Sequence, residues 1–444
     1  MNDFFNKRQV CIEGITDEDL MHYGNLIDKY FDKVWMETNK ENPISKLYRR
    51  KDSLASQELI TLGRALDIIE NNDIHWLSGQ LQKVKSKNIN NIKGALFEII
   101  GFSYVGKSKD YKLKLASDGN PGIDGHLIYN NGARTNISMK NYGVSNFEQK
   151  FQKEMKVVEE YLKDMLIKSN LLSINAIIEF KRYPDGKDYV DLREMLKEGF
   201  NKFSLYLKSE IHTDWVDIIL QPLAGYMLSD KVKSYIIIAL SPQHKNEFVN
   251  LLSKIDDACA NIIKQKKKED NGEINGICIH LSENADIKGC QKVAQNYLND
   301  NPDKPISFII VYSSSVGTSE IDGYNPRIVN VVQPAINIPR YSKWLEENKV
   351  TLPIIEFSMG MHSLKESRNY LIVNDIRKID ISDKYMFQRG EVYEIPKRGI
   401  DGSFISELKL IAPGVKNSFV LPIKKGKFTI VQGVFSEFDE LEIM

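Results

Sequence analysis

The sequence has few cysteines, no net charge and no long hydrophobic run. Its four cysteines form no CxxC pair and have no histidine at zinc-ligand spacing, so we expect neither a disulfide framework nor a zinc site. Its 60 basic and 60 acidic side chains cancel, which removes overall charge as an argument for nucleic-acid binding but still allows a local basic groove. No stretch approaches the roughly twenty apolar residues of a membrane helix, and the amino-terminal stretch MNDFFNKRQV lacks the apolar segment of a signal peptide. We therefore expect a cytoplasmic protein with reduced cysteines and no membrane association.

The chain is long enough for several hydrophobic cores. Because 444 residues, 42% of them apolar, exceed what one ordinary core accommodates, we expect a multidomain α/β protein. Residues 1–88 place apolar side chains three and four positions apart, which predicts a helical N-terminal region. Residues 89–183 follow the order helix, three strands, helix, strand, and residues 184–340 alternate strands with helices, which predicts a second α/β domain. Residues 341–444 contain short strands between Gly, Pro and Lys turns, which predicts a β-rich C-terminal domain.

The segment PGIDGHLIYNNGARTNISMKNY, residues 121–142, is predicted to form a β-hairpin around the turn Asn130-Asn131-Gly132. A two-residue turn would set Asp124 opposite Met139 and separate the polar residues onto opposite faces. A three-residue loop with Gly132 in the left-handed conformation instead sets Asp124 opposite Ser138, with Lys140 on the same face. The pattern leaves both registers open, and it also leaves open that Asp124 is an ordinary turn residue and Lys140 a solvated strand end.

The next helix, predicted from Asn146 to about Lys168, carries an acidic residue on its apolar side. Ser145 and Glu148 form an S-x-x-E capping box that fixes the start of this helix. Glu154 then occupies a position that the helical period assigns to the buried stripe. Since an unpaired buried carboxylate is costly, a metal ion or a nearby lysine would be needed to compensate it. The alternative is that Glu154 lies at the edge of the stripe and reaches water.

With these residues in order, segment 89–183 resembles the PD-(D/E)xK nuclease superfamily, which includes many restriction endonucleases. The resemblance implies a restriction-endonuclease-like αβββαβ core, with the helical region before it and the second α/β and β-rich domains after it. Pro121 and Asp124 correspond to the first half of the motif, and Ser138-Met139-Lys140 stands in place of the acidic tripeptide. This is similar to a subgroup of type II restriction enzymes in which the tripeptide is S-x-K and the acid lies on the following helix, where Glu154 falls.

The resemblance also implies roles for the individual residues. Asp124 and Glu154 would bind Mg²⁺, Lys140 would orient or deprotonate the attacking water, and Ser138 would hydrogen-bond within the site. Glu98 is similar to an acidic residue that many members carry on the first core helix, and it would assist a second ion or tune the first. The segment Glu179-Phe180-Lys181 also reads as an E-x-K tripeptide, but its place after the long helix predicts that it belongs to the fourth core strand. If that order is wrong, it becomes the main rival tripeptide.

The function implied is a magnesium-dependent endonuclease in restriction or antiviral defence, with DNA rather than RNA as the expected substrate. A second copy of the chain and a defence-system protein are the partners left open. The stretch Tyr48, Arg49, Arg50 and Lys51 is predicted to contact phosphates and to stack on a base, although a surface helix end explains it equally well. One alternative is a non-catalytic nucleic-acid-binding or scaffold protein whose core has lost its acid at Ser138. Another is a nuclease gated by a ligand or partner, with a sensing site after the strand that ends in Ser313-Ser314-Ser315.

Overall fold

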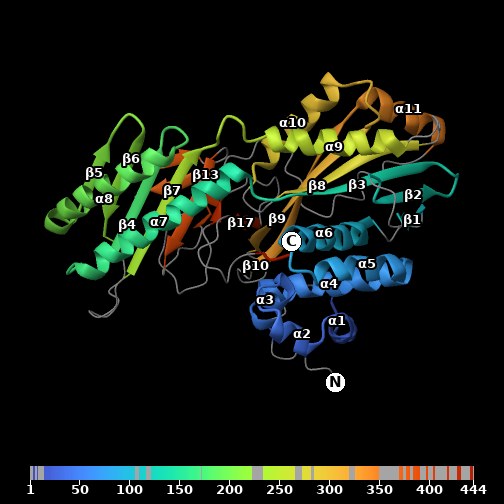
Figure 1. The fold of residues 1–444 in the computed structure, drawn as a ribbon, viewed down its shortest axis with the longest axis horizontal. Helices are drawn as coiled ribbons and strands as arrows, with labels where there is room; N and C mark the ends of the chain where they lie inside the picture. Colours follow the sequence, from blue (N-terminus) through green and yellow to red (C-terminus); the bar gives the residue numbers. More distant parts are fainter. Residues whose placement is uncertain are drawn as a thin grey trace.

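The computed structural model describes residues 4–5, 8, 15–105, 110–116, 122–171, 173–222, 234–265, 273–281, 285–319, 326–349, short strands between 370 and 431, and 441–443. The chain is a mixed α/β protein that has an N-terminal helical region and two large mixed β-sheets. Figure 1 shows the two sheets side by side, with the N-terminal helices beneath the first of them.

The helical region predicted for residues 1–88 is confirmed and extends further along the chain. It comprises α1 (Asp17–Tyr30), α2 (Lys33–Thr38), α3 (Pro43–Arg49), α4 (Ser53–Asn72), α5 (Ile74–Val84) and α6 (Ile89–Val105). Each helix from α1 to α5 begins after an Asp, Asn or Thr whose side chain accepts a backbone N–H of the first turn. Helix α4 packs against α1, α3, α5 and α6, so it forms the centre of this region.

The first sheet carries the predicted hairpin. Its strands lie in the order β1 (Tyr111–Leu115), β2 (Gly125–Tyr129), β3 (Arg134–Tyr142), β8 (Glu273–Leu281) and β9 (Phe308–Ser319), and β10 (Pro326–Ile336) also pairs with β9. The first three strands are antiparallel, whereas β3, β8 and β9 are parallel. Helix α6 packs on one face, and α9 (Val249–Gln265) and α10 (Ile287–Asp300) pack on the other, so the sheet is buried between two helical layers (Figure 1).

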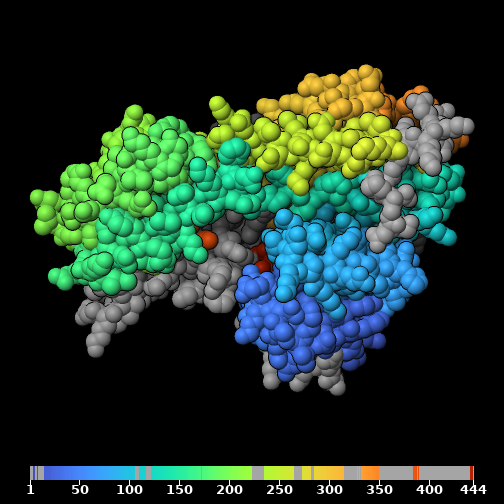
Figure 2. Space-filling view, in the orientation of Figure 1, coloured from blue at the N-terminus to red at the C-terminus, as the bar shows by residue number. Residues whose placement is uncertain are grey.

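The second sheet is built almost entirely from the segment between β3 and α9. Its order is β13 (Lys384–Gly390), β7 (Ser234–Pro242), β4 (Ser173–Phe180), β6 (Val216–Gln221) and β5 (Ser209–His212). Helices α7 (Asn146–Lys168) and α8 (Gly186–Tyr206) bury their apolar stripes on one face of it. Figure 2 shows this unit as a separate green lobe, with α9 running along the surface from its edge toward the first sheet.

The prediction that residues 173–180 form the fourth strand of the hairpin sheet is wrong. Strand β4 pairs with β6 and β7, and the strand that lies beside β3 is β8. The cause is that the chain leaves the first sheet after β3, builds the second sheet, and returns through α9. Since β3 and β8 are parallel, a crossover must connect them, and α9 completes it. Segments 89–183 and 184–340 therefore each contribute to both sheets.

The strands described within residues 341–444 are also divided between the sheets. Strand β13 extends the second sheet, and β17 (Phe428–Val431) with β16 (Ser418–Phe419) extends the first. Two short ladders complete the described strands: β11 (Tyr370–Val373) with β12 (Arg377–Asp380), and β14 (Lys397–Arg398) with β15 (Phe404–Ile405). Apart from residues 341–349 and 441–443, the remainder of the predicted β-rich domain lies outside the described residues. Helix α11 (Ile338–Asn348) precedes these strands. The centre of its Trp344 ring lies 5.7 Å from the centre of the Tyr129 ring.

None of the helices described by the structure combines the length and the apolar character that crossing a bilayer requires.

Candidate active site

The hairpin adopts the register that places the polar residues together. Tyr129 donates its N–H to the carbonyl of Ala133 at 2.9 Å, so the loop contains three residues. Gly132, the last of them, has a φ of +88°, a conformation that glycine adopts without strain. The ladder pairs Gly125 with Ile137, and the Asp124 N–H donates to the Ile137 carbonyl at 2.8 Å. The three-residue loop predicted as one of two alternatives is thus confirmed.

This register gathers three groups around one carboxylate. Asp124 Oδ2 accepts the Met139 N–H at 2.6 Å and the Ser138 hydroxyl at 3.2 Å, and it lies 3.6 Å from Lys140 Nζ. Lys140 Nζ also donates to the Met139 carbonyl at 3.2 Å. The ammonium therefore lies against two hard oxygen atoms, a carboxylate and a strand carbonyl. With side chains 22% and 23% exposed, Asp124 and Lys140 are shielded from bulk water but open to a ligand.

Helix α6 supports the hairpin from the opposite face. A Cβ added at Gly125 would lie 2.6 Å from the Phe102 ring, and one added at Gly101 would lie 3.3 Å from the Met139 methyl group. These glycines allow α6 to approach the strands closely, which fixes the backbone on both sides of Asp124. Cys278 lies on β8 beside Met139. Burial, and secondly the charge of Asp124, raise the pKa of its thiol, so Cys278 stays a neutral core residue.

Helix α9 lies on the side of the site opposite α6. Gly122 has a φ of +122°, and a Cβ there would lie 2.5 Å from Asn261 Cβ, so the loop before Asp124 packs tightly on α9. Toward the other end of this helix, Lys254 is close enough to Lys140 to sense its charge: burial first, and then the Lys140 ammonium, lower the pKa of Lys254. Helix α9 thus runs alongside the Asp124–Lys140 pair.

Lys254 was not among the predicted site residues, although its signal is present in the sequence. It lies three residues after Leu251 and four before Ala258, both of which are fully buried, so it interrupts the apolar stripe of its helix. The same argument had selected Glu154. Lys254 was missed because most of the second sheet lies between β3 and α9 in the sequence. The sequence therefore does not show that α9 is the helix beside β3 in the structure.

Glu154 lies in a different part of the molecule. Its helix packs on the second sheet through Phe151 and Val158, and Glu154 contributes, after larger effects, to raising the pKa of Tyr183 to about 12. Among the described residues, no hydrogen bond or ion pair joins Glu154 to Asp124 or to Lys140. The part of the chain that the structure describes also contains no group of three or more His, Cys, Asp or Glu side chains that could hold a metal ion. The expected second carboxylate is therefore not found beside Asp124.

The remaining predicted acids have other partners. Glu98 accepts a hydrogen bond from Gln80 Nε2 at 2.8 Å, which links α6 to α5. In the rival tripeptide, Glu179 lies 2.9 Å from Lys384 Nζ, and Lys181 Nζ lies 3.0 Å from an Asp217 oxygen. These side chains belong to the second sheet, where each charge is matched by one of opposite sign.

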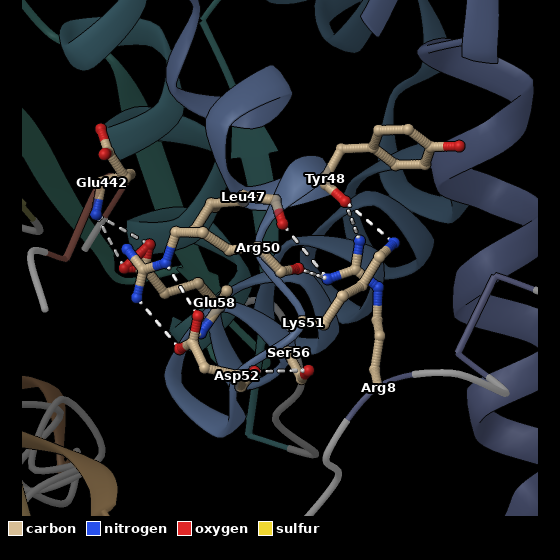
Figure 3. Close-up of polar contacts among 10 residues, drawn as sticks. Arg8, Leu47, Tyr48, Arg50, Lys51, Asp52, Ser56, Glu58 and Glu442 are labelled. Atoms are coloured by element: carbon tan, nitrogen blue, oxygen red, sulfur yellow. Dashed lines mark hydrogen bonds and ion pairs between the residues drawn. The ribbon is translucent and has the colours of Figure 1, made fainter. Parts of the chain in front are cut away.

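The predicted nucleic-acid contacts lie on and just after α3 (Figure 3). Arg50 is buried, and its guanidinium forms a two-point ion pair with Asp52 through contacts of 2.9 and 3.0 Å. Arg49 and Lys51 are exposed, and Lys51 Nζ lies 5.0 Å from the centre of the Tyr48 ring. Arg8 donates to three backbone carbonyls here, those of Leu47, Tyr48 and Arg50. This corner is a tightly bonded structural element, and Arg49 and Lys51 are the exposed residues among the four that were predicted to bind nucleic acid.

Near the same corner, the end of the chain returns to α4. The buried Glu58 carboxylate accepts the backbone N–H groups of Glu442 at 2.8 and 2.9 Å and of Ile443 at 3.1 Å. Burial raises the pKa of Glu58 to about 8.

No protein-family model, curated protein or solved structure matches the chain.

Proposed function

We propose that the chain is a metal-dependent nuclease that hydrolyses phosphodiester bonds of DNA at the Asp124–Lys140 pair. The observation that carries this proposal is the hairpin register, because it brings a carboxylate, a strand carbonyl and an ammonium to one half-buried point. The setting expected from the resemblance, restriction or antiviral defence, belongs to the same proposal.

The order of elements around this point supports a restriction-endonuclease-like core assembled from a different set of elements than the sequence predicted. Helix α6, strands β1 to β3, helix α9 and strand β8 follow one another in the αβββαβ order. In this proposal the whole second sheet is an insertion between β3 and α9. The helix that follows the tripeptide strand within the core is then α9 rather than α7.

The donor atoms at the hairpin fit Mg²⁺. This ion prefers hard oxygen ligands and is commonly held by one or two carboxylates together with water and substrate phosphate. Asp124 and the Met139 carbonyl would hold it, and the ammonium that now contacts both oxygens is a cation in the same place. When bound, Mg²⁺ would stabilise negative charge on the phosphate and make water more acidic.

The protein groups have separate tasks in this proposal. The Met139 N–H and the Ser138 hydroxyl fix the Asp124 carboxylate, so its free lone pairs keep one direction. Lys140 is close enough to hold an attacking water and to offset the negative charge that develops on the phosphate. Ser138 carries no charge, so its contribution is to position Asp124.

A second candidate is a non-catalytic nucleic-acid-binding protein with the same core. The observation that favours it is that, among the described residues, no second carboxylate joins Asp124 at the hairpin, since Glu154 has its neighbours in the second sheet. The two candidates differ in one property, which is whether bound nucleic acid is cut.

The test is a cleavage assay on double-stranded DNA, single-stranded DNA and RNA, each with Mg²⁺ or with EDTA. We expect Mg²⁺-dependent cutting of DNA that falls by about 10² or more in Asp124→Asn and Lys140→Ala. Glu154→Ala should keep most of the activity, and its loss would show that α7 supplies a ligand after all. Binding without cutting by the wild-type chain would reject the nuclease and favour the binding protein.

A further inference from the structure

The surface next to the Asp124–Lys140 pair contains a cleft of about 310 Å³ between the end of β3 and the start of α9. Its walls carry hydroxyl, amide and ammonium groups, and none of the described residues that line it is acidic. The lining includes Tyr142, Ser145 and Asn146 at the end of β3 and the start of α7, and Asn250, Ser253 and Lys254 on α9. A cleft whose only charged side chain is a lysine is suited to an anion.

The cleft lies next to the candidate active site. Tyr142 lies two residues after Lys140 on β3, so the two side chains share a face of the strand. Lys254, from the opposite wall, lies close enough to Lys140 that, after burial, the Lys140 ammonium lowers the pKa of Lys254. At its far end α9 contacts the loop before Asp124 through Asn261. A polymer that follows α9 along this face therefore passes both the cleft and the pair.

The charges around the cleft favour binding of an anion. Asp124 compensates Lys140, whereas no ion pair joins Lys254 to a carboxylate among the described residues. The ammonium groups of Lys140 and Lys254 repel each other, and Asp257 on α9 offsets part of the charge of Lys254. A phosphate placed between the cleft and the pair would remove the remaining repulsion.

Resting on the proposed nuclease function, we propose that this cleft binds a backbone phosphate of duplex DNA beside the one that is hydrolysed, with Lys254 as its ligand. Lys254 is then a positioning residue, and it adds affinity and places the neighbouring phosphate at Lys140. Asn250 and Ser253, one turn or less before it on the same helix, offer hydrogen-bond donors to the same phosphate.

The test measures binding of a fluorescent DNA duplex by anisotropy in EDTA, where no cutting is expected, from about 50 to 200 mM NaCl. Neutralising one phosphate contributes about 0.9 to the slope of log K against log salt concentration. This slope is negative, and Lys254→Ala should reduce its magnitude by about this amount, whereas Lys254→Arg should restore it. Lys264→Ala, an exposed lysine on the same helix, is the matched control and should leave the slope unchanged.

The outcomes separate this inference from the nuclease proposal. An unchanged slope in Lys254→Ala, or the same loss in Lys264→Ala, overturns the role of Lys254 whether or not the protein cuts DNA. A slope that depends on Lys254 in a protein that never cuts DNA supports the cleft and rejects hydrolysis. A Lys254-dependent slope for RNA alone, with no binding of duplex DNA, overturns the assignment of the substrate. Melting temperatures of the variants identify any loss that comes from unfolding.

Discussion

Replacing Glu148 by glutamine should change how the stability of the protein depends on pH. Glu148 lies in the first turn of α7 and is only 4% exposed. Burial first, and then the negative charge of Glu247, raise its pKa from 4.5 to about 8. The folded protein therefore binds this proton more tightly than the unfolded chain does.

The sign and the size of the effect follow from this difference. A raised pKa in the folded state contributes stability that is fully present below pH 4.5 and is lost as the pH rises toward 8. At about 1.4 kcal/mol for each pH unit, the loss between about pH 5 and pH 8 amounts to about 4 kcal/mol. Glutamine keeps the shape of the protonated acid and does not titrate, so Glu148→Gln removes this loss.

The assay is urea unfolding of both proteins at about pH 5 and pH 8, followed by circular dichroism. The free energy of unfolding of Glu148→Gln, relative to wild type, should rise by about 4 kcal/mol between the two pH values. Buried Glu58, whose pKa is also raised to about 8, contributes equally to both proteins and cancels. Glu194→Gln, at an exposed position on α8, is the matched control and should show no such rise. A difference between Glu148→Gln and wild type that is the same at both pH values would refute the reasoning.

Three further predictions concern the backbone and the site. Gly132→Ala should lower the free energy of unfolding by about 1 kcal/mol, because residue 132 has a positive φ. Gly94→Ala, in open space on α6, should instead raise it by about 0.5 to 1 kcal/mol, and urea unfolding measures both changes. Gly276→Ala should cost about 1 to 3 kcal/mol in the same assay, since the new Cβ would lie 2.0 Å from the Phe308 ring. Lys181→Ala should leave DNA cleavage unchanged, and a loss of cleavage would move the active tripeptide to β4.

Local sequence information was sufficient to predict the secondary-structure elements and the presence of the hairpin. The loop Asn130-Asn131-Gly132 allowed two registers, and glycine at its third position is what the observed register requires. Helix α7 begins at the predicted residue because Ser145 Oγ accepts the Glu148 N–H at 3.0 Å. The reciprocal half of the capping box does not form, since the Glu148 side chain is buried beside Glu247 instead. Such features depend on residues a few positions apart, which a sequence displays directly.

The partner of each element could not be read in the same way. Strands β4 and β8 are both apolar and both follow a helix, so periodicity does not show which of them pairs with β3. The helical stripe of α7 likewise shows that one side is buried without showing against which sheet. The same ambiguity applies to Glu154, because a residue on a buried stripe contacts whatever the helix packs on.

The second sheet lies where it can fix the position of α9 over the candidate site. The chain leaves the first sheet after β3 and returns to it before α9, and both of these crossings meet at Glu247. Its carboxylate accepts hydrogen bonds from the hydroxyl groups of Ser145, at 2.8 Å, and of Tyr385 on β13, while its carbonyl accepts the Tyr142 hydroxyl at 3.1 Å. Strand β3, α7, β13 and the start of α9 are thus tied to one residue two positions before α9 begins. Lys254 lies on the second turn of that helix, so its distance from Lys140 is set at this junction. The second sheet therefore has a supporting role at the candidate site, and this role does not require Glu154 as a ligand.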